Sequence, residues 1–221
     1  MNLFKKIADN SSNASLAHSM RSKRYQYFMG MVNQLNRPLN ILDIGGTQEY
    51  WNRMGLNDPG IKITLLNLSQ QATTSPNFIS VVGDATNLSE YKDASFDIVY
   101  SNSVIEHLFT KEGQAKMAAE AKRVGKYHFI QTPNYFFPIE PHFVFPFFQF
   151  LPRAARVWLI NNFNLGHVKK KQSLEEARAQ VDEIRLLSMS EMKKLFPGSM
   201  IWEEKMGGLT KSLVAHNFNV N

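Results

Sequence analysis

The stretch LNILDIGGTQEYW, residues 39–51, places an aspartate and two glycines directly after a run of apolar residues. Such a run predicts a buried strand, and the glycines predict a turn after it. Gly45 and Gly46 lack a Cβ, so they tolerate a positive φ and let backbone N–H groups approach a ligand. We therefore interpret the stretch as a strand that ends at a ligand-binding turn.

Four further apolar runs follow along the chain: IKITLLNLS (61–69), FISVVGDA (78–85), FDIVYSNS (96–103) and YHFIQTPN (127–134). Strands that are apolar at nearly every position are covered on both faces, which is typical of a parallel sheet between helices. GSMIWEEKMGG (198–208) and TKSLVAHN (210–217) then predict an antiparallel hairpin. We expect an α/β, doubly wound, Rossmann-like sheet of seven strands, mostly parallel with an antiparallel edge hairpin.

Helical periodicity appears between these runs. RSKRYQYFMGMVNQLN (21–36) carries an apolar stripe at three- and four-residue spacing, and the Arg-Pro pair at 37–38 ends it. TKEGQAKMAAEAKRVG (110–125) predicts a helix that ends at Gly125. We expect residues 1–38 to form an N-terminal helical lid and residues 39–221 to form the main domain.

Residues 133–183 form an unusual insertion before the hairpin. Its first part, PNYFFPIEPHFVFPFFQFLP, is rich in aromatic residues and contains five prolines, which exclude a regular strand or helix. Helices are expected at 153–163 and around 173–184. We interpret the insertion as an aromatic cap over a binding pocket; plain hydrophobic packing, or a surface for an anionic or membrane-bound acceptor, remain alternatives.

Polar residues come directly after the predicted strands, at the carboxyl ends where parallel sheets bind ligands. They are Asp43, Gly45, Gly46 and Thr47 after the first strand, Asn67, Leu68 and Ser69 after the second, Gly83, Asp84 and Ala85 after the third, and Ser101, Asn102 and Ser103 after the fourth. A strand-to-helix turn at Gly45–Gly46, a helix N-cap at Asp84 and a plain turn at Asn67 are the structural alternatives.

The series resembles the class I S-adenosylmethionine-dependent methyltransferases over residues 39–132 and 186–217. LDIGG resembles the family's Asp-x-Gly-x-Gly loop, and LLNLS takes the place of its second strand. VVGDATNL resembles the adenine-binding segment, SFDIVYSNSVIEHL resembles the fourth-strand motif, and the closing hairpin matches the family's reversed last strand. The resemblance implies S-adenosyl-L-methionine as the cofactor.

It also implies roles for single residues. Asp43, Gly45, Gly46 and Thr47 would form the first loop, Asn67 and Leu68 would meet the ribose, Asp84 and Ala85 the adenine, and Ser101 and Asn102 the methionine moiety. Two positions depart from the family pattern, since Thr47 replaces a glycine and Asn67 replaces the ribose-binding acid. Asn67 can still accept from a hydroxyl through its amide oxygen.

Candidate bases for methyl transfer to a hydroxyl are His142, His107, Glu140 and His167. EPH (140–142) lies at the start of the cap, so His142 is the first choice and His107 the second, although either can be a structural histidine. The fourth strand lacks the Asn-Pro-Pro element of nitrogen methyltransferases, which disfavours nucleic-acid substrates. The segment 101–103 also lacks the acid that catechol-type members use to bind a metal, so we expect a metal-independent O-methylation.

The composition fits this interpretation. The chain of 221 residues has no cysteine, a net charge of +6 and no apolar run long enough for a membrane span, so we expect a cytoplasmic protein. Its basic groups, Arg21/Lys23/Arg24 and Lys169–Lys171, are interpreted as solvated surface. The TPN and EPH segments are similar to methyltransferases of bacterial glycan and secondary-metabolite pathways, which suggests a sugar hydroxyl or related small molecule, free or lipid-linked. Alternatives are a non-catalytic cofactor-binding protein and an RNA methyltransferase.

Overall fold

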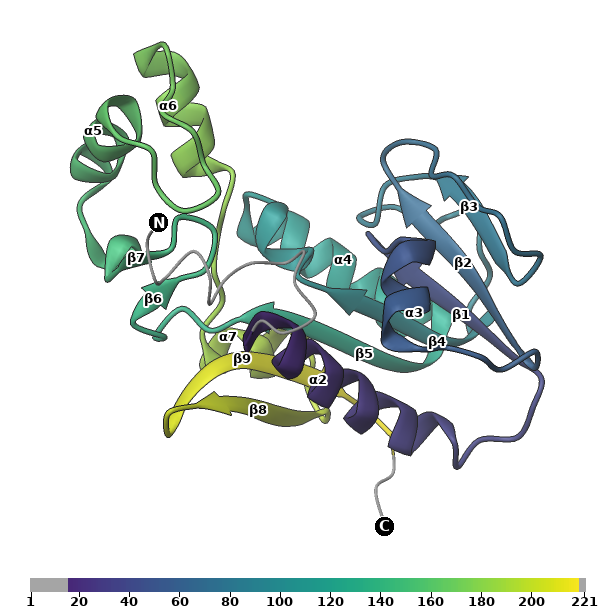
Figure 1. The fold of residues 1–221 in the computed structure, drawn as a ribbon. Helices are drawn as coiled ribbons and strands as arrows, with labels where there is room; N and C mark the ends of the chain where they lie inside the picture. The colour runs from purple at the N-terminus through teal and green to yellow at the C-terminus, as the bar shows by residue number, and fades with distance from the viewer. Residues whose placement is uncertain (1–15, 219–221) are drawn as a thin grey trace.

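The computed structural model describes residues 16–218 and contains a seven-stranded sheet in the order β3-β2-β1-β4-β5-β9-β8 (Figure 1). The strands are β1 (Leu39–Ile44), β2 (Ile61–Asn67), β3 (Phe78–Val82), β4 (Phe96–Asn102), β5 (Gly125–Pro133), β8 (Met200–Met206) and β9 (Leu209–His216). The first five are parallel, and β9 is antiparallel to both β5 and β8. The predicted doubly wound sheet with its antiparallel edge hairpin is therefore confirmed.

Two apolar clusters cover the two faces of the sheet. On one face, α2 (Leu16–Val32) and α3 (Gln48–Met54) bury residues that include Phe28 and Trp51, both 0% exposed. On the other face, α4 (Lys111–Val124) and α7 (Met189–Leu195) pack against alternate side chains of the same strands. This coverage explains why the strands are apolar at almost every position.

The helices depart from the sequence-based bounds in small ways. α2 ends at Val32, before the predicted end at residue 36, because Gln34 and Leu35 donate to the carbonyls three residues earlier and tighten the chain into turns. Thr110 caps α4 by accepting from the Gly113 N–H at 3.0 Å. Gly125 ends α4 as predicted, in an extended conformation that begins β5.

The cap contains α5 (Arg153–Asn162) and α6 (Leu174–Asp182), which stand away from the sheet at the end where β4 and β5 finish (Figure 1). It also contains a hairpin of β6 (Ile139–Glu140) and β7 (Phe145–Pro146), so the expectation of no strand here is wrong. Pro146 is tolerated because a two-residue strand at an edge does not require its missing N–H. The cap has its own apolar cluster around Phe143 and Phe148.

The N-terminal part of the predicted lid, residues 1–15, lies outside the described residues. The described part, α2, packs along the sheet and reaches the strand ends with Arg21 and Arg24. Among residues 16–218, no helix is both long and apolar enough to cross a bilayer.

Candidate cofactor and acceptor site

The turn after β1 requires glycine at two positions for two different reasons. Gly45 has φ +78°, and a Cβ there would lie 2.4 Å from Val104 Cγ2. Gly46 does not use the positive φ that glycine permits, but a Cβ there would lie 1.6 Å from Asp43 Oδ2. The turn is therefore closely packed against Asp43 of its own strand and against Val104 after β4, so only its backbone could approach a ligand.

Asp43 lies beneath this turn. It is 1% exposed, and it accepts a hydrogen bond from Trp51 Nε1 at 2.7 Å. Burial raises the pKa of Asp43 to about 7, and the Trp51 hydrogen bond only partly opposes that rise. Asp43 therefore supports the turn from its buried side.

Of the other residues predicted at the strand ends, some use their side chains within the fold and others keep a side-chain atom available to a ligand. Thr47 caps α3 through its hydroxyl, and the buried Ser101 donates to the Ile44 carbonyl at 3.3 Å, so both hydroxyls are engaged within the fold. Asn67 donates its amide N–H to the Gly46 carbonyl at 2.9 Å, which leaves its amide oxygen available. Leu68 is 83% exposed just beyond it. The parallel register brings all these residues together at the carboxyl ends of the strands.

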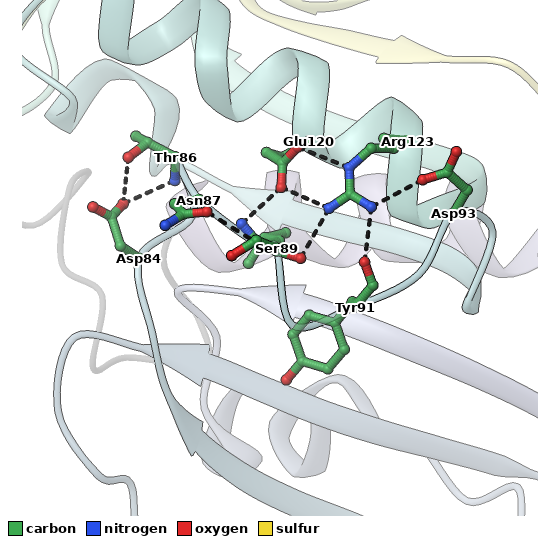
Figure 2. A network of polar contacts seen from close by, with 9 residues as sticks. Asp84, Thr86, Asn87, Ser89, Tyr91, Asp93, Glu120 and Arg123 are labelled. Atoms are coloured by element: carbon green, nitrogen blue, oxygen red, sulfur yellow. Dashed lines mark hydrogen bonds and ion pairs between the residues drawn. The ribbon is translucent and has the colours of Figure 1, made fainter.

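The loop after β3 holds Asp84 close to the carboxyl end of that strand. Asp84 Oδ1 accepts from both the backbone N–H and the hydroxyl of Thr86, each at 2.8 Å (Figure 2). No α-helix begins here, so the N-cap alternative is wrong; residues 84–87 form a turn closed by a bridge. Arg123 of α4 fixes the loop by donating to the carbonyls of Leu88 and Tyr91, and it pairs with Glu120 and Asp93.

A buried ion pair lies next to the carboxyl end of β4. Arg24 pairs with Glu204 of β8 at 2.8 Å, and both side chains are 5% exposed. Arg24 also donates to the side-chain oxygen of Asn102 at the end of β4. The solvated-surface interpretation is therefore wrong for Arg24, because an apolar stripe in α2 turns this residue inward.

A cavity of about 480 Å³ runs from Asn102 to the cap. Its walls include Arg24 of α2, Asn102 and His107 at and just after the end of β4, and His142 and His167 of the cap. Of the residues predicted to hold a cofactor, the cavity reaches Asn102 at the end of β4, and it joins this residue with the histidines predicted to act on an acceptor.

The histidine His142 is held by a carboxylate. Its Nδ1 lies 2.7 Å from Glu140 Oε1, while Glu140 Oε2 accepts the backbone N–H groups of His142 and Phe143 at 2.8 and 2.7 Å. The His107 ring lies 5.0 Å from the His142 ring at an interplanar angle of 90°. Burial disfavours protonation of His142, but the hydrogen bond to Glu140 and the charges of Glu140 and Glu106 outweigh it and raise the pKa of His142.

Glu106 completes this group and was not among the predicted site residues. It is 0% exposed, and burial raises the pKa of its carboxyl to about 7. Ligand atoms of Glu106, His107 and His142 all lie within 4.8 Å of one another, so they could hold a metal ion. In the sequence Glu106 stands next to His107, but His142 is far along the chain, and only the fold brings the three together.

Comparisons with known proteins agree with this geometry. Residues 42–128 match the model of a family described as a methyltransferase domain. Two uncharacterized proteins of Mycobacterium tuberculosis are 41% identical over 63 residues, 28% of this chain and 21% of theirs. The matched region thus spans about a fifth of the length of these curated relatives.

Among solved structures, the CurJ carbon methyltransferase aligns with a TM-score of 0.56 at 11% identity, over 95% of this chain and 56% of that chain. A Rhodobacter sphaeroides protein named as a zinc-dependent alcohol dehydrogenase aligns with a TM-score of 0.56 at 13% identity, over 89% and 97%. At these identities the structures support the fold alone. The family match, which covers less than half of the chain, makes residues 42–128 similar to a methyltransferase domain and indicates S-adenosylmethionine as the cofactor.

Proposed function

We propose that this chain transfers the methyl group of S-adenosylmethionine to an oxygen of a small-molecule acceptor, a hydroxyl of a sugar or a related metabolite. The supporting observation is the cavity that Asn102 lines together with His107 and His142. A cofactor seated along the ends of β1 to β4 would present its sulfonium to this cavity, and an acceptor would enter from the cap side.

The cofactor would be held by residues at the carboxyl ends of four strands. In the proposal the Gly45–Gly46 backbone meets the amino-acid tail, the free amide oxygen of Asn67 meets a ribose hydroxyl, and Asp84 meets the adenine amine. The remaining residues assigned to this site are Asp43, Thr47, Leu68, Ala85, Ser101 and Asn102. Glu120 and Arg123 support Asp84 indirectly, because they hold its loop on α4.

The chemical step needs little from the protein. The sulfonium is a good leaving group, so the protein aligns the acceptor oxygen with the methyl group and assists loss of the hydroxyl proton. We assign this assistance to His142, with His107 second. Glu140 orients the His142 ring through the Nδ1 contact of 2.7 Å and so acts as a positioning residue.

The charges around the cavity favour an acceptor that carries an anionic group. Lys211 and Arg24 line the same wall, and Glu204 pairs with Arg24 behind it. The Lys211 ammonium lies 3.3 Å from the Met20 sulfur, a weak partner, and burial lowers the pKa of Lys211. A carboxylate or phosphate on the acceptor would compensate this partly buried positive charge.

The aromatic cap contributes to the cavity through fewer residues than its composition suggests. Phe143 and Phe148 are 2% and 1% exposed within the cap's own cluster, whereas Phe147 is 57% exposed. The apolar wall of the cavity includes Phe137 and Ile139 instead. Ile139→Ser is therefore expected to raise the acceptor KM while leaving S-adenosylhomocysteine binding unchanged.

Calorimetry with S-adenosylmethionine and S-adenosylhomocysteine tests the proposal. We expect binding of both, and at least tenfold weaker binding in Asp84→Asn, because the amide replaces one acceptor by a donor. Asp93→Asn, in the same loop but 81% exposed beside Arg123, is the matched control and should bind normally.

The same experiment separates the alternatives. Slow hydrolytic or acceptor-dependent turnover with binding supports an enzyme, whereas binding without any turnover across sugar and metabolite acceptors supports a non-catalytic cofactor-binding protein. Salt-sensitive RNA affinity would support an RNA methyltransferase instead. Absence of cofactor binding at high micromolar concentration would contradict the proposal.

A further inference from the structure

The side chains of Glu106, His107 and His142 form a compact group at the wall of the acceptor cavity, with ligand atoms within 4.8 Å of one another. We propose that this group binds a divalent transition-metal ion of the zinc type, with an open coordination position toward the cavity. The inference rests on the proposed function and refines how the acceptor hydroxyl is activated.

The donor set and the spacing fit such an ion. Two imidazoles and one carboxylate are ligands that zinc prefers, and three protein ligands with a fourth open position are typical of catalytic zinc sites. With zinc–ligand bonds of about 2.1 Å, tetrahedral ligands lie about 3.4 Å apart. Small side-chain rotations of these three residues would close the present spacing.

The carboxylate of Glu106 provides an independent observation. Glu106 is 0% exposed, and its Oε2 accepts from the Thr132 hydroxyl at 3.0 Å. Over the described residues, its Oε1 has no hydrogen-bond partner. Because a buried carboxylate oxygen without a partner is costly, a positive ion at this point would compensate it.

The surroundings of His142 prepare it to bind a metal. A carboxylate only accepts hydrogen bonds, so the 2.7 Å contact with Glu140 places the ring proton on Nδ1 and leaves the Nε2 lone pair available. Glu140 is itself fixed by two backbone N–H groups. A carboxylate behind a ligating histidine is the usual supporting arrangement at metal sites, since it sets the tautomer and the ring orientation.

The position of the group connects it to the reaction. His107 and His142 both line the acceptor cavity, so the open coordination position would face an acceptor hydroxyl. A hydroxyl bound to the ion loses its proton to solvent more readily. The resulting oxygen forms the new bond to the methyl carbon as the carbon–sulfur bond breaks, which releases S-adenosylhomocysteine. In the loaded enzyme His142 thus acts as a ligand, which replaces the expected metal-independent reaction.

Direct metal binding tests this inference. The 221-residue protein, dialysed against a chelator, is titrated with zinc in competition with a chromophoric chelator, and with cobalt while its visible absorption is followed. We expect one equivalent of zinc to bind, and cobalt bands of a four-coordinate site. Glu106→Gln and His142→Gln should each weaken zinc binding at least 100-fold, and Glu140→Gln should weaken it about 10- to 100-fold.

His167→Gln is the matched control, because His167 lines the same cavity outside the group and its loss should leave zinc affinity unchanged. Far-UV circular dichroism verifies that each variant is folded. Wild-type protein without zinc binding, or equal effects of His142→Gln and His167→Gln, would overturn the inference. Calorimetry with S-adenosylhomocysteine on the same samples keeps the two proposals apart: intact cofactor binding without zinc binding refutes only the metal site, and the converse refutes only the cofactor site.

Discussion

Replacing Asp43 by asparagine should change how the stability of this protein depends on pH. Burial raises the pKa of Asp43 from 3.8 to about 7, so the native state holds a proton that the unfolded chain has lost. Between these two values the native state binds more protons than the unfolded state, and the free energy of unfolding falls as pH rises. The free energy of unfolding stops falling about one pH unit above the native-state pKa of about 7.

The size of the effect follows from the shift. About three pKa units at 1.36 kcal/mol per unit give about 4 kcal/mol of stability lost between about pH 4 and pH 8. Asp43 is 1% exposed, so solvent does not screen this term. An asparagine side chain at this position would still accept from Trp51 through its amide oxygen but would not titrate. The Asp43→Asn variant should therefore gain about 4 kcal/mol relative to the wild type over this range, whatever their offset at the acid end.

The assay is equilibrium unfolding in urea from about pH 4.5 to 8.5, followed by circular dichroism and by fluorescence to verify coincident transitions. Asp97→Asn is the control. Its carboxyl is partly buried, but Lys126 and the Asn40 N–H keep its pKa below the ordinary value, so it stays charged over this range. Parallel curves for wild type and Asp43→Asn would refute the argument that burial sets the charge of Asp43.

Three further outcomes are expected. Burial lowers the pKa of His128 from 6.5 to about 4, so as the pH falls the unfolded chain takes up a proton before the native state does. The free energy of unfolding should therefore fall by about 3 kcal/mol from pH 6.5 to 4, and urea titrations of His128→Gln should lack this fall. Gly46→Ala would place a methyl group against the Asp43 carboxyl and should lower both Tm and the affinity for S-adenosylhomocysteine. Gly30→Ala, in open space on α2, should instead add about 1 kcal/mol to the free energy of unfolding. Glu204→Gln leaves Arg24 buried without its partner and should cost about 3–5 kcal/mol in urea unfolding; a loss below about 1 kcal/mol would contradict this.

The sheet was predictable because its strands are apolar on both faces and end in turn residues. All seven predicted strands form, and the parallel strands and the antiparallel closing hairpin run in the predicted directions. The short helices α3 and α7 were not located, because seven residues give too little periodicity. The β6–β7 hairpin was missed because proline content was used as a rule, while an edge position tolerates Pro146.

The candidate site was predictable to the extent that it lies directly after strands. The edge of a parallel sheet gathers such residues, so Gly45, Asn67, Asp84 and Asn102 could be grouped from the sequence. Contacts that join distant segments could not be found in this way. Arg24 reaches Asn102 across the sheet, and Glu106 meets His142 of the cap, without any local pattern that marks either pair.

The Arg24–Glu204 pair has a consequence for synthesis of the chain. It joins the first described helix to β8, which is the next-to-last strand along the chain and lies at an edge of the sheet, and the two residues are 180 positions apart. A ribosome therefore delivers Arg24 long before its counter-charge emerges from the exit tunnel, and the nascent polypeptide cannot neutralise this guanidinium on the partly built sheet. Completion of the wall next to Asn102 must be a late event, which delays ligand capture until β8 has left the ribosome.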